Sequence, residues 1–598
     1  EGTAINNLSI TANQFSAQDI KVGGTLSITN SGTSEISGAI TGDTALTKAG
    51  SGQLTVSGTN TYSGDTNVNA GTLFGGTDSG SNDSFGSGAI TVASGATLQI
   101  NDSSDGALTN ALTLNGGTLY ATSGSGSYYD GNITLGAHST LRSDGTLYVD
   151  GVISGSSKNL TKTGTGAAYL RGTNTYSGST TISAGTFGLA GAGTLESGTY
   201  AGAISNSGIF KFDSSANLIS TGAISGSGSV LVTGSGTFEP KATNTYTGGT
   251  TVDGGIIAAY TDRNWGAVPG SVDSDNIILK NGGKAIFGSK NSTNTSGHTY
   301  WVANRGINLP TSGQQFIEMG SGGNGAAHIQ GVINGIGGVT FTRSGSKTIR
   351  VYGNNTYTGD TKFNFTSGSN NNISITTRAF QNSTVYLSPT NTNVGRGFSR
   401  TTGSGNIILG GLAGDATDWR IGRDIEFGSN NQDTTVTGGL SRYASSNTLI
   451  KKGSGTTTFS ATSGQEQQNA VGIQVDAGKL VLNGDWGRNN ASAGNIAVAS
   501  GATFEINSAQ NNSFTGVLSG SGNIIFSGSG TNTFSGTNTF TGSTTISNGT
   551  LKIGGSGVIG DGSYSGAIAN SGIFEYNSST DQTLSGVISG SGQVKLTG

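Results

Sequence analysis

Three short segments combine a tryptophan with charged neighbours, and they are the strongest candidates for a ligand-binding role. The segments are Asp262-Arg263-Asn264-Trp265, Asp418-Trp419-Arg420 and Asp485-Trp486-Gly487-Arg488. A flat aromatic ring with polar neighbours suits the ring of a sugar. The residues that we expect to contact a ligand are Trp265, Arg263, Trp419, Arg420, Trp486 and Arg488. The alternative is that each tryptophan covers the core at a bend and satisfies its N–H locally.

Residue types for catalysis and metal binding are scarce. The only histidines are His138, His298 and His328, and there is no cysteine. Three histidines are too few to favour a histidine-based catalytic triad or a multi-histidine zinc site. Residues 555–560 fit the pattern G-x-G-x-x-G, but a turn and a strand pattern follow in place of the helix that a nucleotide site needs. We therefore predict no catalytic residue, no metal site and no cofactor.

A set of aspartates keeps one enzymatic alternative open. Carboxylates on one face of a β-helix could bind Ca²⁺ or perform acid–base chemistry on a polysaccharide. The aspartates concerned are Asp273, Asp275, Asp415, Asp418 and Asp424.

The composition restricts the elements that must position these residues. Glycine supplies 106 of 598 residues, about 18%, against roughly 7% in average usage. Charged residues make up 10%, and there are 4 prolines. Collagen, disordered chains and long helical proteins do not fit these values. The net charge of −4 and the lack of a long apolar run predict neither nucleic-acid binding nor membrane insertion. A β-rich chain with many tight turns fits.

The chain contains internal repeats. One unit, residues 46–73, reads LTKAGSGQLTVSGTNTYSGDTNVNAGTL, and related units begin at residues 160, 230, 339 and 524, with a divergent copy at 449. A longer block, residues 161–234, recurs at 525–598, an offset of 364 residues. Each unit has short strands with period-2 alternation, broken by glycine turns. One such unit cannot bury its own apolar face, but stacked units bury it as a continuous column.

The sequence therefore predicts an all-β protein, a right-handed parallel β-helix (β-solenoid) in one elongated column. We expect roughly 20–28 residues per rung and successive rungs about 4.8 Å apart. In the repeated Asn-Thr-Tyr triplet, we expect the asparagine to mark a left-handed turn or an amide ladder. The aromatic residue should fill an inward or corner position, and phenylalanine at one copy indicates that a phenol hydroxyl is not required. These structural repeat residues are Asn60, Tyr62, Asn174, Tyr176, Asn244, Tyr246, Asn355, Tyr357, Asn538 and Phe540.

The amino-acid composition changes in the middle of the chain. Residues 256–440 hold 14 of the 29 lysines and arginines and three of the four tryptophans. We predict three regions: 1–255 as a solenoid with recognisable repeats, 256–440 as a solenoid with longer and more charged side loops, and 441–598 as a solenoid with recognisable repeats. Gly598 corresponds to Gly234, which lies part-way through a unit. The chain is therefore expected to continue beyond this point or to stack end to end with other copies.

The pattern G-x-L-x-x-S-G-x-N-T-Y-[ST]-G-x-T-x-[VI]-x-x-G-x-L resembles the autotransporter-associated β-strand repeat. Residues 52–73 and 166–187 carry it best. The resemblance implies a β-helical passenger, exported across the outer membrane of a Gram-negative bacterium and located extracellularly or at the cell surface, often for adhesion or aggregation.

The function that we expect is a non-enzymatic structural or adhesive solenoid: a surface stalk, an adhesin or a biofilm matrix component. The expected partners are glycans, cell surfaces or further copies of the chain itself. The alternatives are a subunit of an extracellular filament formed by end-to-end stacking and a polysaccharide-active β-helix enzyme.

Overall fold

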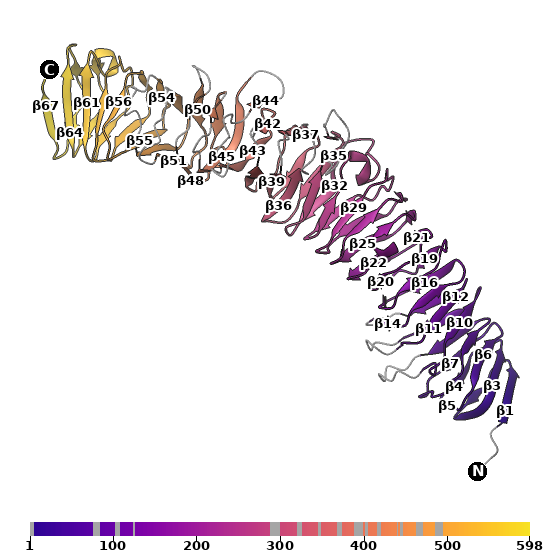
Figure 1. Cartoon of the computed structure of the whole chain (residues 1–598). Coiled ribbons are helices and arrows are strands. Elements are labelled where there is room, and N and C mark those ends of the chain that lie inside the picture. The colour runs from indigo at the N-terminus through magenta and orange to yellow at the C-terminus, as the bar shows by residue number, and fades with distance from the viewer. Residues whose placement is uncertain are drawn as a thin grey trace. The chain divides into compact units, whose positions relative to one another are not determined.

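The computed structural model is a parallel β-solenoid, as the repeats predicted (Figure 1). It describes residues 5–75, 84–101, 108–122, 126–287, 299–319, 326–344, 348–367, 373–387, 399–400, 405–415, 420–421, 423–438, 441–442, 447–461, 471–484 and 494–598. These residues form 67 β-strands, no α-helix and three 3-10 turns: η1 (Glu196–Gly198), η2 (Asp262–Trp265) and η3 (Gly560–Gly562). None of these helical turns approaches the length or apolarity of a membrane span.

The chain divides into two compact units. Unit 1 contains Glu1–Pro269, Asn276–Ile278 and Gly283–Ala285, and unit 2 contains the other residues up to Gly598. The division into three regions at residues 255 and 440 rests on composition and stays a prediction.

In unit 1, each face of the solenoid is a parallel sheet. One face contains β3 (Ile20–Asn30), β6 (Ala45–Ala49), β8 (Thr66–Val68), β10 (Ile90–Ala93), β12 (Leu112–Asn115), β15 (Ile133–Leu135) and β18 (Ile153–Ser154). The second contains β7 (Gln53–Val56), β9 (Thr72–Gly75), β11 (Thr97–Ile100), β13 (Thr118–Ala121), β16 (Ser139–Ser143), β19 (Leu160–Thr163) and β21 (Thr180–Ile182). The third contains β14 (Ser127–Tyr129), β17 (Thr146–Val149), β20 (Ala167–Leu170), β22 (Thr186–Gly191), β25 (Ile209–Ser214) and β28 (Ser229–Val232).

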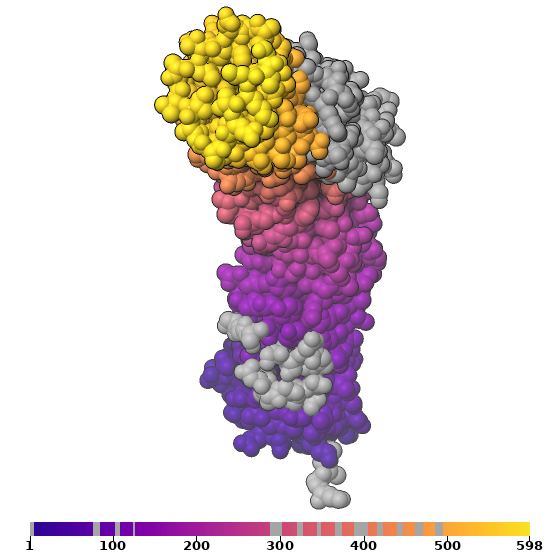
Figure 2. Space-filling model, turned by 90° about the vertical axis from the view of Figure 1, so that its left-hand side faces the viewer, coloured from indigo at the N-terminus to yellow at the C-terminus, as the bar shows by residue number. Residues whose placement is uncertain are grey.

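The strand register gives the length of a rung. Leu46 pairs with Thr66, Thr66 with Ile90, and Ile90 with Leu112, which are steps of 20, 24 and 22 residues. These steps lie inside the predicted range. Alternate side chains point inward, so Leu54 and Val56 are fully buried while Thr55 is not. In the space-filling view, the described residues of unit 1 carry the colours from indigo to magenta (Figure 2).

Unit 2 is built in the same way, with every described strand pair parallel. Its faces include β47 (Ile425–Phe427), β50 (Thr448–Lys451), β52 (Gly472–Val475), β54 (Ile496–Val498) and β57 (Leu518–Gly520). They also include β58 (Asn523–Phe526), β60 (Thr544–Ile546), β63 (Ile568–Asn570), β59 (Thr531–Phe534), β61 (Thr550–Gly555) and β64 (Ile573–Ser578). The 364-residue recurrence is a structural repeat: β22, η1 and β25 of unit 1 correspond to β61, η3 and β64, and Ser197 and Asp561 share a φ of 54°.

The repeat asparagines connect three successive rungs. In all five, the side-chain Oδ1 accepts the backbone N–H of a residue 20 to 22 positions earlier, at 2.7–2.9 Å. The Nδ2 group donates to a backbone carbonyl of the following rung at 2.7–3.0 Å. None of these asparagines has a positive φ. At the corner, where backbone N–H and C=O groups have no partner in the strand ladder, the asparagine amide supplies the hydrogen bonds. The expected left-handed turn and the expected ladder of amides are both absent at these five residues.

The repeat aromatics lie in the core and are at most 2% exposed. The hydroxyls of Tyr62, Tyr176, Tyr246 and Tyr357 each share a hydrogen bond of 2.5–2.8 Å with the threonine four residues later.

Phe540 has no hydroxyl group, but the threonine four residues later still has a hydrogen-bond partner. Thr544 shares a hydrogen bond of 2.9 Å with the hydroxyl of Tyr564 from the next rung. Tyr200 stands at the equivalent place in unit 1 and bonds Thr180 at 2.7 Å, in addition to Tyr176. The second tyrosine explains why the repeat tolerates phenylalanine at 540.

Three buried lysines are a feature that the sequence analysis missed. Lys48, Lys162 and Lys451 occupy the third position of their repeats and are fully buried. Their column neighbours are apolar: Lys48 pairs with Ile28 and Val68. The equivalent residues in other repeats are Val232 and Phe526. The sequence pattern therefore indicates an apolar core residue at this position and does not reveal a buried lysine.

Each buried ammonium is held by backbone carbonyls. Lys162 Nζ donates to the carbonyls of Thr163, Gly164 and Ala184 at 2.7, 2.9 and 3.4 Å. Lys48 and Lys451 repeat this geometry with their own corner carbonyls. Three acceptors match the three protons of an ammonium group. Burial lowers the pKa of each lysine to about 8, so all three remain mostly charged at neutral pH.

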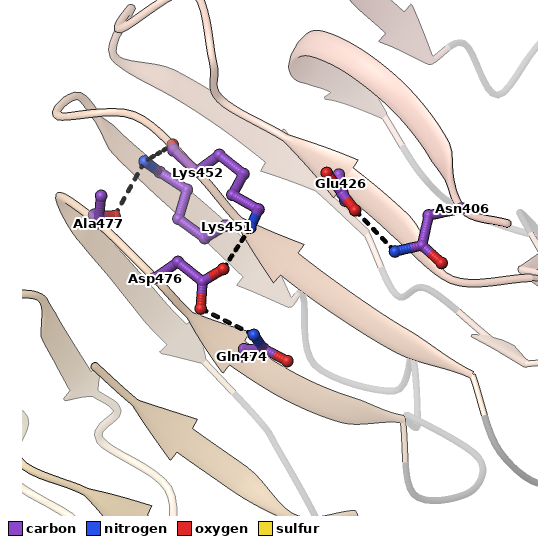
Figure 3. A network of polar contacts seen from close by, with 7 residues as sticks. All are labelled: Asn406, Glu426, Lys451, Lys452, Gln474, Asp476 and Ala477. Atoms are coloured by element: carbon purple, nitrogen blue, oxygen red, sulfur yellow. Dashed lines mark hydrogen bonds and ion pairs between the residues drawn. The ribbon is translucent and has the colours of Figure 1, made fainter. Parts of the chain in front are cut away.

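The lysine next to Lys451 behaves differently (Figure 3). Lys452 faces outward and forms an ion pair with Asp476, which also accepts a hydrogen bond of 2.8 Å from Gln474. The hydrogen bond to Asp476 raises the pKa of Lys452. The last residue of β50 and the residue that follows it thus carry ammonium groups in opposite settings, because successive side chains of an extended backbone point to opposite faces.

We expect the Asn174→Ala variant to lose protection locally. The change leaves the buried N–H of Ile153 and the carbonyl of Thr194 without their side-chain partner. Such losses cost about 1–3 kcal/mol, so the Ile153 amide should exchange with solvent about tenfold faster or more. Hydrogen exchange followed by mass spectrometry measures this. Thr175→Ala, at the exposed neighbouring position, is the control, and equal exchange in the two variants would contradict the role of Asn174.

The buried lysines predict a pH-dependent stability. Between pH 8 and roughly pH 10.5 the folded chain binds fewer protons than the unfolded chain, because burial lowers the folded-state pKa to about 8. Stability therefore rises with pH across this window, relative to a chain without these lysines. The test compares the parent with the triple variant Lys48→Met, Lys162→Met, Lys451→Met. We expect the melting temperature of the parent minus that of the triple variant to increase between pH 8 and pH 10.

The matched control for this series is Lys452→Met, which removes an outward lysine. Its melting temperature should keep a constant difference from the parent over pH 8 to 10. If the triple variant also keeps a constant difference, the lysines do not lose their protons in the folded chain in this range.

Candidate functional site

The first tryptophan cluster lies in the core. Trp265 ends η2 and is 1% exposed, while Arg263 in the same turn is exposed. Two hydrogen bonds join this turn to the repeat asparagine Asn244. Its backbone N–H donates to the Arg263 carbonyl at 2.8 Å, and its Nδ2 group donates to the Asn264 carbonyl at 2.7 Å. The ring of Trp265 is therefore not available to stack on a sugar, which agrees with the alternative of a tryptophan covering the core at a bend.

The other two clusters are described only in small part. Trp419, Trp486 and Arg488 lie outside the described residues, as do Asp418 and Asp485. Arg420 begins β46 (Arg420–Ile421), which pairs with β49 (Ser441–Arg442). A ligand-binding role for these residues stays a prediction.

Three of the five aspartates considered for acid–base chemistry accept hydrogen bonds from neighbouring groups of the chain. Asp273 accepts the N–H of Asp275 at 3.0 Å, and Asp275 accepts a hydrogen bond from Asn308. Asp424 accepts the N–H of Thr448 at 2.7 Å. Within the described part of the chain, no three acidic or histidine side chains gather in a way that could hold a metal ion.

The most distinctive outward-facing group in unit 1 is a row of tyrosines, which we name the tyrosine strip. It contains Tyr128 of β14, Tyr148 of β17 and Tyr169 of β20, which are register partners on three successive rungs. Their rings stack with centroids 4.8 and 5.6 Å apart and interplanar angles of 21° and 20°. The strand spacing sets this distance, because in-register side chains of neighbouring parallel strands lie one above the other.

A glycine and a lysine close the strip on the following rungs. Gly188 is the register partner of Tyr169, and Lys211 is that of Gly188. A Cβ atom at 188 would lie 2.5 Å from the Tyr169 ring, so the ring occupies the space that a side chain would need. The Nζ atom of Lys211 lies 5.4 Å from the Tyr169 ring centroid. This distance is that of a cation–π contact.

Paired charges flank the strip. The Arg171 guanidinium lies 5.3 Å from the Tyr148 centroid and forms an ion pair of 3.1 Å with Asp150. Lys211 forms an ion pair of 2.9 Å with Asp213. Since each cation has its own carboxylate, the strip carries no unneutralised positive charge. These side chains keep part of their surface exposed, so the ion pairs contribute little to stability.

A second aromatic group lies on the neighbouring face of unit 1. The Tyr120 hydroxyl of β13 donates to Asp144 at 2.8 Å, and Arg142 pairs with the same carboxylate at 2.8 Å. Arg142 also lies 4.3 Å from the Tyr120 ring centroid. This group satisfies its own polar atoms. It differs in this respect from the tyrosine strip.

Sequence reasoning did not find the tyrosine strip. The three tyrosines stand outside the repeated triplet, at spacings of 20 and 21 residues. The signal that could have revealed them is this spacing, which equals one rung.

Comparison with known proteins supports the repeat assignment. The family model described as passenger-associated-transport-repeat matches residues 46–73, 160–188, 231–259, 341–364 and 527–553. The chain is similar to a protein named "Adhesin BmaC autotransporter" from Brucella suis biovar 1 (strain 1330), with 28% identity over 481 residues. The match covers 59% of this chain and 14% of the relative, so this chain spans a small part of the relative's length. No solved structure matches the chain.

The five matched segments contain the repeat asparagines, which link the rungs, and the buried repeat aromatics. The resemblance that the Asn-Thr-Tyr pattern indicated is thereby confirmed. This chain is a β-solenoid that carries five copies of the passenger-associated-transport-repeat.

Proposed function

We propose that this chain is a non-enzymatic, adhesive region of a protein that is exported across the outer membrane of a Gram-negative bacterium and exposed at the cell surface. The observation that carries the proposal is the occurrence of five passenger-associated repeats, three in unit 1 and two in unit 2. The similarity to an autotransporter adhesin supports the adhesive part.

The physical character of the solenoid favours presentation of a surface over catalysis. The inward positions are filled by apolar side chains, and the described aspartates that were considered for chemistry bind polar groups of neighbouring residues. Outward positions repeat once per rung at nearly constant spacing. Such a scaffold presents long, rigid rows of side chains, which suit contact with an extended partner.

Surface exposure is tested on intact producing cells. Antibodies against this chain should label the cells, and external proteinase K should remove the label while a periplasmic marker stays intact. Fab fragments against the chain should also reduce the number of cells that attach to a test surface. Labelling that requires permeabilised cells would contradict the proposed location, and unchanged attachment would contradict the adhesive role.

The enzymatic alternative makes a different prediction. We expect no reducing ends and no unsaturated products when the purified chain is incubated with a panel of neutral and acidic polysaccharides, because the described aspartates act as local hydrogen-bond acceptors. A product with any polysaccharide, lost in the Asp424→Asn variant, would support the enzyme instead.

A further inference from the structure

The hydroxyls of the tyrosine strip differ from those of the core tyrosines. In the core, Tyr129 donates to the Asn110 carbonyl at 2.9 Å and Tyr200 donates to the Gly178 carbonyl at 2.6 Å. The hydroxyls of Tyr128 and Tyr148 make no hydrogen bond to another described residue, although both rings are partly buried by stacking. Two phenol groups on adjacent rungs therefore keep a hydrogen-bonding capacity that no other described residue uses.

The strip is rigid before any partner arrives. Tyr148 is stacked on both sides, by Tyr128 and by Tyr169, and the Arg171 guanidinium lies close to two of the rings. Side chains that are already ordered lose little conformational entropy on binding. Because the ring faces cover one another, the strip offers ring edges and hydroxyls, in a row along the direction in which the rungs stack.

The charges around the strip select the class of partner. Arg171 is paired with Asp150 and Lys211 with Asp213. Among the described residues of the strip, an acidic polymer would therefore meet only cations that already have a carboxylate partner. A neutral, hydroxyl-rich chain would find phenol hydroxyls, carboxylates and a guanidinium, all of which exchange hydrogen bonds with hydroxyl groups.

We propose that the tyrosine strip is a binding site for a neutral polysaccharide, which lies in extended form across successive rungs. The hydroxyls of Tyr128 and Tyr148 exchange hydrogen bonds with sugar hydroxyls, while Arg171 and Asp150 border the chain. The site rests on the proposed adhesive function and gives it a ligand class. It differs from the tryptophan clusters in that its three tyrosines lie on one described sheet face.

The test is affinity electrophoresis of the purified 598-residue chain in native gels that contain hydroxyethylcellulose, laminarin, galactomannan or alginate. We expect at least one of the three neutral polymers to retard the chain and the acidic alginate to leave it unretarded. The double variant Tyr128→Phe, Tyr148→Phe keeps both stacked rings and removes only the two hydroxyls. Its dissociation constant should be about tenfold higher, since two hydrogen bonds are lost.

The matched control is Tyr120→Phe, which removes a hydroxyl that is already bonded to Asp144. This variant should bind like the parent, and circular dichroism should show the same fold for all three proteins. Retardation by none of the neutral polymers, stronger retardation by alginate, or parental binding by the double variant would each overturn the proposal.

The two proposals fail in distinguishable ways. If cells attach through the chain but the double variant attaches equally well, the strip is not the binding site and the adhesive function stands. If the purified chain binds a neutral polymer through the strip but is absent from the cell surface, the site stands and the proposed function fails.

Discussion

The parallel hydrogen-bond register between rungs is the constraint on which this structure depends. It repeats each backbone position about once every 19 to 24 residues and places like positions one strand spacing apart. A charge repeated in register would face its own copy, which accounts for a chain with 10% charged residues. Wherever the backbone leaves the ladder at a corner, its N–H and C=O groups need other partners. The repeat asparagines supply them, and this is why the same residue recurs at the same corner in five units.

The corner carbonyls also explain how the core accepts lysine. An unpaired buried charge is costly, but three carbonyls around each ammonium make the position tolerable. The stem of Lys162 lies between Leu141 and Ile182 in the column, so its methylene groups pack as an apolar residue would. Valine or phenylalanine occupies the same position in other units, as Val232 and Phe526 show. One structural position thus admits two chemically different residues, and the fold does not change.

Function in such a scaffold is confined to what points outward. The inward face must satisfy packing on every rung, whereas an outward side chain contacts its neighbours above and below and otherwise faces solvent. The tyrosine strip uses this freedom: three rungs carry stacked rings and the next carries a glycine that makes room for the last one. The result is a row rather than a pocket. An extended partner suits a row, because the affinity then accumulates over several rungs.

The sequence by itself determined the class of fold, the rung length, and the inward placement of the repeat aromatics, because these follow from periodicity and from glycine turns. Only the tertiary structure decided which residues from different rungs meet. The steps from Tyr128 to Tyr148, Tyr169, Gly188 and Lys211 are 20, 21, 19 and 23 residues. Loops of unequal length shift the count from rung to rung, so a column cannot be followed by counting along the sequence. The burial of Trp265 and the carbonyl partners of the lysines depend on the same register, since those contacts join residues about 20 positions apart that only the stacked rungs bring together.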